Sequence, residues 1–355
     1  MSGCMPHIGA LPAGARNSVT DVPGVTVGQC TLADGACQTG VTVVLPHGGN
    51  LFADKVPAAA TVLNGFGKSV GLVQVEELGV LETPIALSNT FAVGALSQAQ
   101  IRQAIAANPE IGRAWPTVNP LVFECNDGYL NDIQAMAVQE AHYAQACAAA
   151  SVDFAQGAVG AGRGMSSFGL KGGIGSASRQ AGEYHVGVLV QANFGTLPSF
   201  TVAGARLGGV LAERLKAHTQ APAECGPEKG SIIMILATDA PLDARQLRRL
   251  SLRAGAGLAR TGSVFGHGSG DIALAFSTAY TVPQQAGASM PALAMLHETR
   301  LDALFHAAAD SVEQAILHAL WQAETVRGRD GHQRVALREL MPGLPQWLQR
   351  TAPTN

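Results

Sequence analysis

The sequence predicts an α/β protein in which helices flank β-sheets within one large domain. Segments typical of strands alternate with segments typical of helices along the whole chain of 355 residues. Hydrophobic residues make up 47% of the chain and charged residues only 14%, so the chain can bury a large core. Aromatic residues make up 5%, and 42 glycines are present, which indicates small-residue packing and many tight turns.

The first half of the chain contains short β-prone runs and two helical segments. We expect strands at GVTVG (24–28), GVTVVLP (40–46), AATVLNG (59–65), LVQVEELG (72–79) and PIALSNT (84–90). We expect helices over 96–108 and 130–150. The second helix is long and alanine-rich, and Asn131 and Asp132 suit a capped start.

The second half continues the alternation of strands and helices. Strands are expected over 183–194, 231–242 and 271–279, and helices over 205–218, 241–261 and 298–324, with Pro241 in the first turn of its helix. The last helix has the clearest amphipathic pattern. Its apolar stripe consists of Leu301, Leu304, Phe305, Ala308, Val312, Ala315, Ile316 and Ala319.

The dipeptide Gly230-Ser231 lies where a polar segment meets a buried strand. Residues 219–230 are rich in Pro, Gly and charge, which is typical of an exposed linker. A cut between Gly230 and Ser231 would place a serine at a new N-terminus. Its α-amine, with a pKa of roughly 7.7–8.0, could activate its own hydroxyl. Gly-Ser before a strand is also common in ordinary loops. The surrounding sequence must therefore show whether this dipeptide has a catalytic function.

Several further motifs occur in a fixed order over most of residues 17–340. They are NSVTDVPGVTVGQCTL (17–32), ECNDGYLND (124–132), GAVGAGRGM (157–165), VLVQANFG (188–195), SIIMILATDAPL (231–242) and GHGSGDIALAFST (266–278). Taken together, they resemble the L-aminopeptidase D-amidase/D-esterase family, which includes the β-peptidyl aminopeptidases. The resemblance implies a four-layer αββα sandwich of the N-terminal-nucleophile-hydrolase type, with no metal and no organic cofactor.

The resemblance also implies roles for three residues around the reacting carbonyl. Ser231 would attack the carbonyl carbon, and its own α-amine would accept the hydroxyl proton. Asn193 would donate a hydrogen bond to the oxyanion, and Tyr129 would supply a second polar group. Asn193 and Tyr129 could equally be turn and core residues.

Three acidic or hydroxyl residues complete the predicted site. Ser269 and Asp271 lie two residues apart, so on a strand they face the same side. Ser269 would hydrogen-bond the catalytic amine, and Asp271 would orient it and balance its charge. Glu124 would bind the ammonium group of the substrate. The ordinary alternatives are a β-turn pair for Ser269 and Asp271 and a solvated carboxylate for Glu124.

Maturation follows from the same chemistry. Self-cleavage between Gly230 and Ser231 would give fragments 1–230 and 231–355, the second of 125 residues, which remain associated. The expected enzyme removes N-terminal residues from small peptides, amino-acid amides or esters, as a homo-oligomer of processed pairs. Two alternatives remain open: a self-cleaving acyltransferase of the ornithine acetyltransferase type, which processes before threonine, and an uncut, non-catalytic binding protein.

Four competing motifs are weaker. Gly67-Lys68-Ser69 resembles the end of a phosphate-binding loop, but Val62 stands where its first glycine should be. Residues 67–71 match G-x-S-x-G, but that motif needs a following helix, and a strand is expected there. Cys125 has no nearby histidine. A Ser-His-Asp triad of His267, Ser269 and Asp271 is a minor possibility.

Composition excludes several classes of function. The net charge of -3 includes no basic excess, so nucleic-acid binding is not expected. No apolar stretch approaches the ~18 residues of a membrane span, and no signal peptide is visible. The six cysteines form no metal-ligand or disulfide pattern, so we expect reduced thiols in a cytoplasmic protein. Lys68 and Phe91 depart from the family pattern and are expected to affect specificity.

Overall fold

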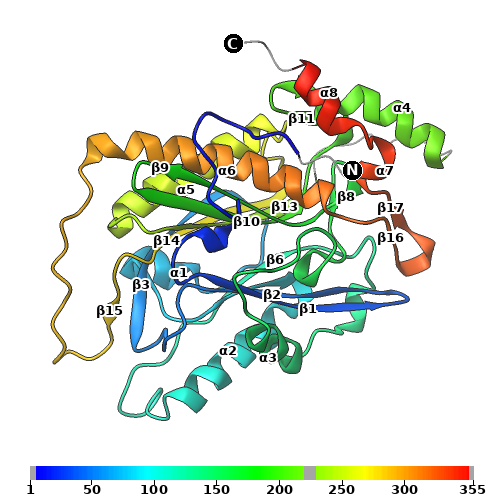
Figure 1. The fold of residues 1–355 in the computed structure, drawn as a ribbon. Helices are drawn as coiled ribbons and strands as arrows, with labels where there is room; N and C mark the ends of the chain where they lie inside the picture. Colours follow the sequence, from blue (N-terminus) through cyan, green and yellow to red (C-terminus); the bar gives the residue numbers. More distant parts are fainter. Residues whose placement is uncertain (1–4, 220–228, 352–355) are drawn as a thin grey trace.

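The chain forms four layers, as the sequence predicts. The structure, a computed structural model, describes residues 5–219 and 229–351. Two β-sheets pack face to face, and helices cover the outer face of each sheet (Figure 1). The predicted αββα sandwich is therefore confirmed.

The smaller sheet contains four strands in the order β1-β2-β5-β6. The β5–β6 pair is parallel, and the other pairs are antiparallel. Parallel pairing puts the carboxyl ends of β5 and β6 at one edge, which becomes a wall of the site. The strands are β1 (Thr26–Asp34), β2 (Cys37–Leu45), β5 (Ile85–Asn89) and β6 (Leu121–Cys125).

The larger sheet contains seven strands, with the main order β15-β3-β14-β13-β10-β9 and β4 paired to β3. Its central pair, β13 and β14, is parallel, while β10 and β3 run antiparallel to it on either side. As a result, β13 and β14 begin at the edge where β10 and β3 end. The strands are β3 (Asp54–Gly65), β4 (Val80–Leu81), β9 (Gly173–Ala181), β10 (Tyr184–Asn193), β13 (Lys229–Thr238), β14 (Gly268–Ser277) and β15 (Val282–Pro283).

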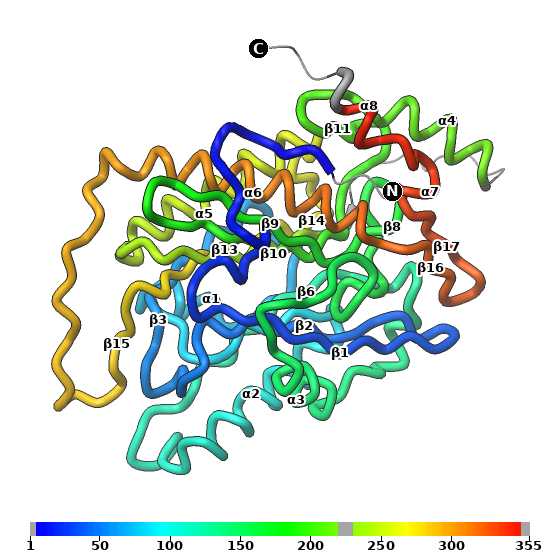
Figure 2. Tube along the Cα trace, in the orientation of Figure 1, coloured from blue at the N-terminus to red at the C-terminus, as the bar shows by residue number. Residues whose placement is uncertain are grey.

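Helices α5 and α6 cover the larger sheet, and α2 and α3 cover the smaller one (Figure 2). In the described part of the chain, three two-stranded hairpins and four further α-helices lie around this sandwich. The helices are α1 (Leu72–Leu78), α2 (Val93–Ala107), α3 (Glu140–Ala148), α4 (Gly208–Thr219), α5 (Ala244–Arg260), α6 (Leu301–Trp321), α7 (Leu337–Leu340) and α8 (Leu344–Thr351). The hairpins are β7 (Ser166–Ser167) with β8 (Leu170–Lys171), β11 (Thr201–Val202) with β12 (Ala205–Arg206), and β16 (Val326–Arg327) with β17 (Gln333–Arg334).

The core is divided by the sheets into separate apolar layers. Along β13, Ile232 and Met234 belong to the core under α5 and α6, whereas Ile233 and Ile235 belong to the core between the sheets. This alternation is the period of a strand buried on both faces. It fixes the direction of the neighbouring side chain of Ser231, which shares the face of Ile233.

The segment LVQVEELG was expected to be a strand, and this prediction is wrong. It forms helix α1, which begins after Gly71 and ends before Gly79, both with positive φ. Only Val75 is buried, and Val73 is 85% exposed. In a helix this short, the apolar-polar alternation around Val73 and Val75 resembles the period of a strand.

The single helix expected over 130–150 is also wrong in its first half. Only α3 forms, while Ile133–Ala135 is a 3₁₀ turn that ends at Met136 with φ of +48°. Asn131 does not cap a helix, because its side chain accepts from Gln38 N and donates to Asp127 Oδ1, both at 3.0 Å. These bonds hold the segment against β2 and in a non-helical conformation.

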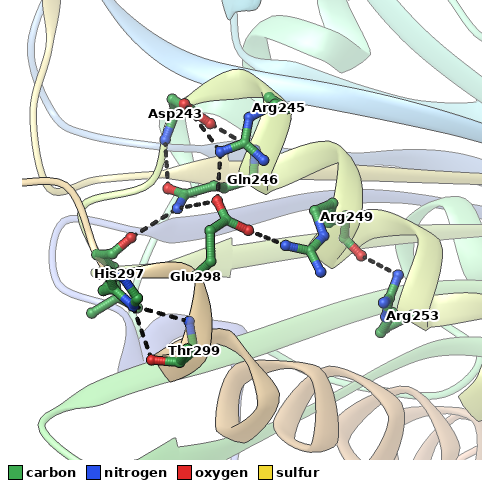
Figure 3. Close-up of polar contacts among 9 residues, drawn as sticks. Asp243, Arg245, Gln246, Arg249, Arg253, His297, Glu298 and Thr299 are labelled. Atoms are coloured by element: carbon green, nitrogen blue, oxygen red, sulfur yellow. Dashed lines mark hydrogen bonds and ion pairs between the residues drawn. The ribbon is translucent and has the colours of Figure 1, made fainter.

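Helices α5 and α6 are positioned by a polar cluster at their N-terminal ends (Figure 3). Asp243 caps α5, accepting from Gln246 N at 2.7 Å, so Pro241 precedes the helix and does not occupy its first turn. Arg245 and Arg249 of α5 both bind Glu298, just before α6. Hydrogen bonds led by the one from Arg245 lower the pKa of Glu298 to about 2.

Helix α6 is buried nearly all round and lacks the single buried stripe that was expected. The polar residues Asp310, Ser311, Glu313 and Gln314 are buried together with the predicted apolar positions. Each polar side chain has a partner; for example, Glu313 accepts from Ala203 N at 2.9 Å. No helix within residues 5–219 and 229–351 is long and apolar enough to cross a membrane.

Candidate active site

The predicted site residues meet at a pocket of about 730 Å³ beside the start of β13. Ser231, Asn193, Tyr129 and Glu124 all line it. They come from both sheets and from a turn after β6, so the fold unites residues more than 100 positions apart in sequence. The other lining residues are Phe66, Lys68, Thr90, Asn126, Ser166, Gly169, Gly195, Thr196, Leu197, Gly230, Gly268 and Arg334.

Ser231 lies between two neighbouring strands with its hydroxyl held. Asn193 of β10 is opposite Ser231 on one side, and Gly270 of β14 is opposite it on the other. Ser231 is 5% exposed, and its Oγ accepts a hydrogen bond from Gly270 N at 3.2 Å. Because the oxygen accepts this bond, the hydroxyl hydrogen remains available for transfer to a base.

Gly230 occupies a position that only glycine can take. Its φ is +113°, and a Cβ built there would lie 2.0 Å from the carbonyl oxygen of Asn193. Gly230, which contributes the carbonyl of the peptide bond before Ser231, therefore has a backbone conformation that is unfavourable for other residues. The rest of the expected linker, residues 220–228, lies outside the described residues.

Two glycines, Gly270 and Gly67, lie between the Ser231 hydroxyl and the Glu124 carboxylate. A Cβ on Gly270 would lie 3.0 Å from Ser231 Oγ and 3.1 Å from Gly67 Cα. A Cβ on Gly67 would lie 3.6 Å from Glu124 Oε1. Closely packed glycine backbone therefore separates the hydroxyl from the carboxylate on the β14 side of Ser231, and Ser231 and Glu124 line the same pocket.

Glu124 is buried at the end of β6 and is held by two hydrogen bonds. Its Oε1 accepts from Lys68 N at 2.8 Å, and its Oε2 accepts from the hydroxyl of Thr90. The ammonium group of Lys68 lies over the ring of Phe66, with Nζ 4.1 Å from the ring centroid. The carboxylate is thus fixed at the pocket wall. Phe91 is 50% exposed and is absent from the residues that line this pocket.

The side chain of Asn193 is anchored at both ends. Its Oδ1 accepts from Ser166 N at 2.8 Å, and its Nδ2 donates to Asn126 O at 3.0 Å. A side-chain amide nitrogen carries two hydrogens. The second makes no hydrogen bond among the residues that the structure describes, so the geometry leaves one donor for a ligand in the pocket.

Tyr129 forms part of a stack of three side chains. Its ring lies 4.6 Å from that of His332, nearly parallel, and the guanidinium carbon of Arg334 lies 3.7 Å from its centroid. The stack fixes the Tyr129 ring at the pocket wall.

Ser269 and Asp271 are brought together behind the pocket. The Ser269 hydroxyl donates to Asp271 Oδ1 at 2.6 Å, and both residues are fully buried. In register, Ser269 is opposite Gly230 and Asp271 is opposite Ile232. The strand alternation places them on the Ile232 face of the sheet, whereas the backbone nitrogen of Ser231 lies in the sheet plane between the faces.

The competing motifs are not assembled into sites. His267 is exposed and does not come between Ser269 and Asp271, which bond directly. Burial raises the pKa of the Cys125 thiol well above its usual value, so little thiolate forms. Helix α1 does follow the G-x-S-x-G run, contrary to our expectation, but Ser69 is not among the lining residues. Within the described chain, no cluster of His, Cys, Asp or Glu could hold a metal ion.

Thr90 and Arg334 are two of the pocket residues that have no role in the sequence-based prediction. Thr90 follows β5, as Asn126 follows β6. Because these two strands pair in parallel, their sequence could have been used to predict that Thr90 lies beside Glu124. Arg334 comes from hairpin β16–β17, more than 100 residues after Ser231. No sequence pattern around Arg334 indicated its position.

The carboxyl of Asp127, in the turn that carries Tyr129, gives a testable pH dependence. Burial raises its pKa from 3.8 to about 6. Between about pH 4 and pH 6, Asp127 is therefore protonated in the folded chain and ionised in the unfolded chain. As a result, the unfolding free energy falls as the pH rises through this range. We expect Asp127→Asn to raise the unfolding free energy by about 1–3 kcal/mol at pH 7.5 and by much less at pH 4.5. Thermal unfolding at both pH values measures this; equal effects would contradict it.

Comparison with known proteins identifies the family of the chain. The profile of peptidase family S58 matches residues 17–334. The chain belongs to peptidase family S58. It is also 39% identical, over an aligned length of 362 residues, to β-peptidyl aminopeptidase BapA of Sphingosinicella microcystinivorans, an alignment that covers 96% of this chain and 90% of that protein.

Solved structures of family relatives have the same fold. The PH0078 protein of Pyrococcus horikoshii OT3 superposes with a TM-score of 0.88 at 44% identity, covering 97% of this chain and 96% of that one. The L-aminopeptidase D-Ala-esterase/amidase of Ochrobactrum anthropi superposes with a TM-score of 0.84 at 33% identity, covering 96% of this chain and 97% of that one. That protein is described as a prototype for the serine aminopeptidases and a variant of the Ntn hydrolase fold. The predicted family, fold and class, a hydrolase of the aminopeptidase type, are confirmed.

Proposed function

We propose that this S58 aminopeptidase activates itself by cleavage before Ser231 and then uses Ser231 as an N-terminal nucleophile. The observation that carries the proposal is the position of Ser231. It lies directly after a glycine of unusual φ, and it lines a pocket together with Asn193 and Glu124. These residues supply a hydroxyl, an amide donor and a carboxylate around one space.

Maturation begins with attack of Ser231 Oγ on the carbonyl carbon of Gly230. The C–N bond breaks as the new C–O bond forms, the amine takes up the hydroxyl proton, and water then hydrolyses the ester. The chain becomes 1–230 and 231–355. Strands β13 and β14 of the second fragment lie between β10 and β3 of the first, so the sheet itself holds the fragments together. An oligomer of such pairs, which the resemblance implies, is part of this proposal.

The free α-amine of Ser231 then acts as the base in peptide hydrolysis. It accepts the proton of Ser231 Oγ while this oxygen attacks the substrate carbonyl, and it returns a proton to the leaving amine. The amine nitrogen lies in the sheet plane, beside the face of the neighbouring strand β14 that carries Ser269 and Asp271. We propose that Ser269 hydrogen-bonds the amine and that the Asp271 carboxylate stabilises its protonated form.

Stabilisation of the oxyanion is assigned to Asn193. The hydrogen bond from its Nδ2 to Asn126 O fixes the amide plane, and its second hydrogen would serve the oxyanion in the pocket that Asn193 lines. A fixed donor needs no reorganisation during the reaction, which is why such groups contribute strongly to rate. Tyr129 supplies a further polar group at the same wall.

Glu124 is proposed to bind the substrate ammonium group. Its carboxylate is fixed by Lys68 N and Thr90, and Glu124 lines the same pocket as Ser231. A free N-terminus of a small peptide, amino-acid amide or ester would pair with it. Relatives are named for β-peptidyl and for L-amino-acid substrates, so both α- and β-amino amides should be tested first.

The function is tested with amides of alanine and β-alanine and their N-acetyl derivatives. We expect turnover of the free-amine compounds only. Glu124→Gln keeps the shape and the acceptor oxygen but loses the charge, so KM should rise about 10- to 100-fold with a smaller change in kcat. Glu76→Gln, on the exposed Arg248 ion pair of α1, is the matched control and should leave both constants unchanged. Hydrolysis of the acetylated amides at equal rates would contradict the proposal.

A further inference from the structure

Arg334 places a positive charge on the wall of the same pocket. It comes from β17, and its guanidinium lies over the ring of Tyr129. Its Nε donates to Ser166 Oγ at 3.3 Å, and a terminal nitrogen donates to Gly169 O at 3.4 Å. The guanidinium is therefore held at the pocket by Tyr129, Ser166 and Gly169.

The hairpin that carries Arg334 is attached to the turn that carries Tyr129. The His332 ring nitrogen Nδ1 lies 2.9 Å from Tyr129 O, and Arg329 donates to Gly128 O with two nitrogens, at 3.2 and 3.0 Å. These contacts keep hairpin and turn together as one wall. Arg334 is thus a fixed part of the pocket, although it is distant in sequence from every other charged lining residue.

Glu124 and Arg334 are connected to opposite sides of Ser231. On the β14 side, Gly270 and Gly67 lead from the Ser231 hydroxyl to Glu124. On the β10 side, the cross-strand partner Asn193 binds Ser166 N, and Ser166 Oγ binds Arg334. The contacts of Ser231 therefore lead to the carboxylate of Glu124 on one side and to the guanidinium of Arg334 on the other.

We propose that Arg334 binds the C-terminal carboxylate of the substrate, so that the preferred substrates are peptides of two or three residues with both termini free. The inference rests on the proposed function. When Glu124 holds the ammonium group and Ser231 attacks the first carbonyl, the leaving group extends toward the other wall. In a dipeptide, the leaving residue carries the C-terminal carboxylate. The planar guanidinium of an arginine can bind both oxygens of a carboxylate, which the ammonium group of a lysine does less well.

The test compares β-alanyl-alanine and alanyl-alanine with the same dipeptides as C-terminal amides. We expect the wild type to have a higher kcat/KM for the free acids. Arg334→Gln should lower kcat/KM about 10- to 100-fold for the free acids, mainly through KM, and less than about threefold for the amides. Arg334→Lys should retain part of the preference. Arg327→Gln is the control, because Arg327 lies on the partner strand of the same hairpin but does not line the pocket. It should change kcat/KM neither for the free acids nor for the amides.

The outcomes separate this inference from the function on which it rests. Equal losses on acids and amides after Arg334→Gln would show that Arg334 only supports Tyr129, and would overturn the inference. A wild type that prefers the amides would overturn it as well and leave the aminopeptidase intact. If the wild type turned over none of the four compounds, the proposed function itself would be wrong. The intact mass of each variant shows whether it is processed like the wild type.

Discussion

Replacement of Ser231 with alanine is expected to leave one uncut chain without aminopeptidase activity. The alanine variant lacks the oxygen that attacks Gly230, so the amide nitrogen of residue 231 never becomes a free amine. Nucleophile and base are thus lost together, and turnover should fall by at least about a thousandfold. The fold should persist, because residue 231 remains paired with β10 and β14 through its backbone.

Intact mass under denaturing conditions, measured beside wild type, decides this prediction. The wild type should give fragments 1–230 and 231–355, and Ser231→Ala a single mass. Ser231→Thr, which keeps a hydroxyl, should still be cut but more slowly, because its methyl group must fit beside Gly270. Ser97→Ala, a serine on α2 that bonds only within its helix, is the control and should be cut normally. A cut alanine variant, or an uncut wild type, would refute the mechanism.

The sequence predicted those elements whose own pattern is sufficient to define them. Helix α2 is a long segment in which apolar and polar residues are mixed without Pro. Strand β13 contains an uninterrupted apolar run that is bounded by turn residues. The two segments assigned to the wrong secondary structure failed for different reasons. Helix α1 is too short to show a helical period. Residues 130–139 would continue α3 on propensity, but Asn131 is bonded to Gln38 and Asp127 instead.

The layer arrangement and the site roles came from the family resemblance, because composition cannot order strands in a sheet. Strand periodicity did place Ser269 and Asp271 on one face, where they bond to each other. Arg334 could not be predicted, because its place depends on a two-stranded hairpin that Tyr129 and Gly128 hold against the pocket. Such contacts across the chain leave no periodic pattern in the sequence.

Asn193→Asp is expected to lower kcat by about 100- to 1000-fold with little change in KM. The aspartate still accepts from Ser166 N, so the pocket wall keeps that anchor. It loses both amide hydrogens, and with them the proposed oxyanion donor; loss of one such donor elsewhere costs about 2.7–4 kcal/mol in the transition state. The negative charge adds repulsion toward the developing oxyanion and toward Asn126 O.

A structural role for Asn193 predicts a different result, and this difference makes the experiment decisive. If the side chain only held Ser166 and Asn126 in place, the variant would loosen the pocket, and KM would rise while kcat changed little. Asn119→Asp is the matched control, since Asn119 also donates to a backbone carbonyl, Gly71 O at 3.0 Å, but lies outside the lining residues. It should cost stability without loss of kcat. Steady-state kinetics on protein shown by mass to be cut separates transition-state stabilisation from support of the pocket, because only the first acts on kcat alone.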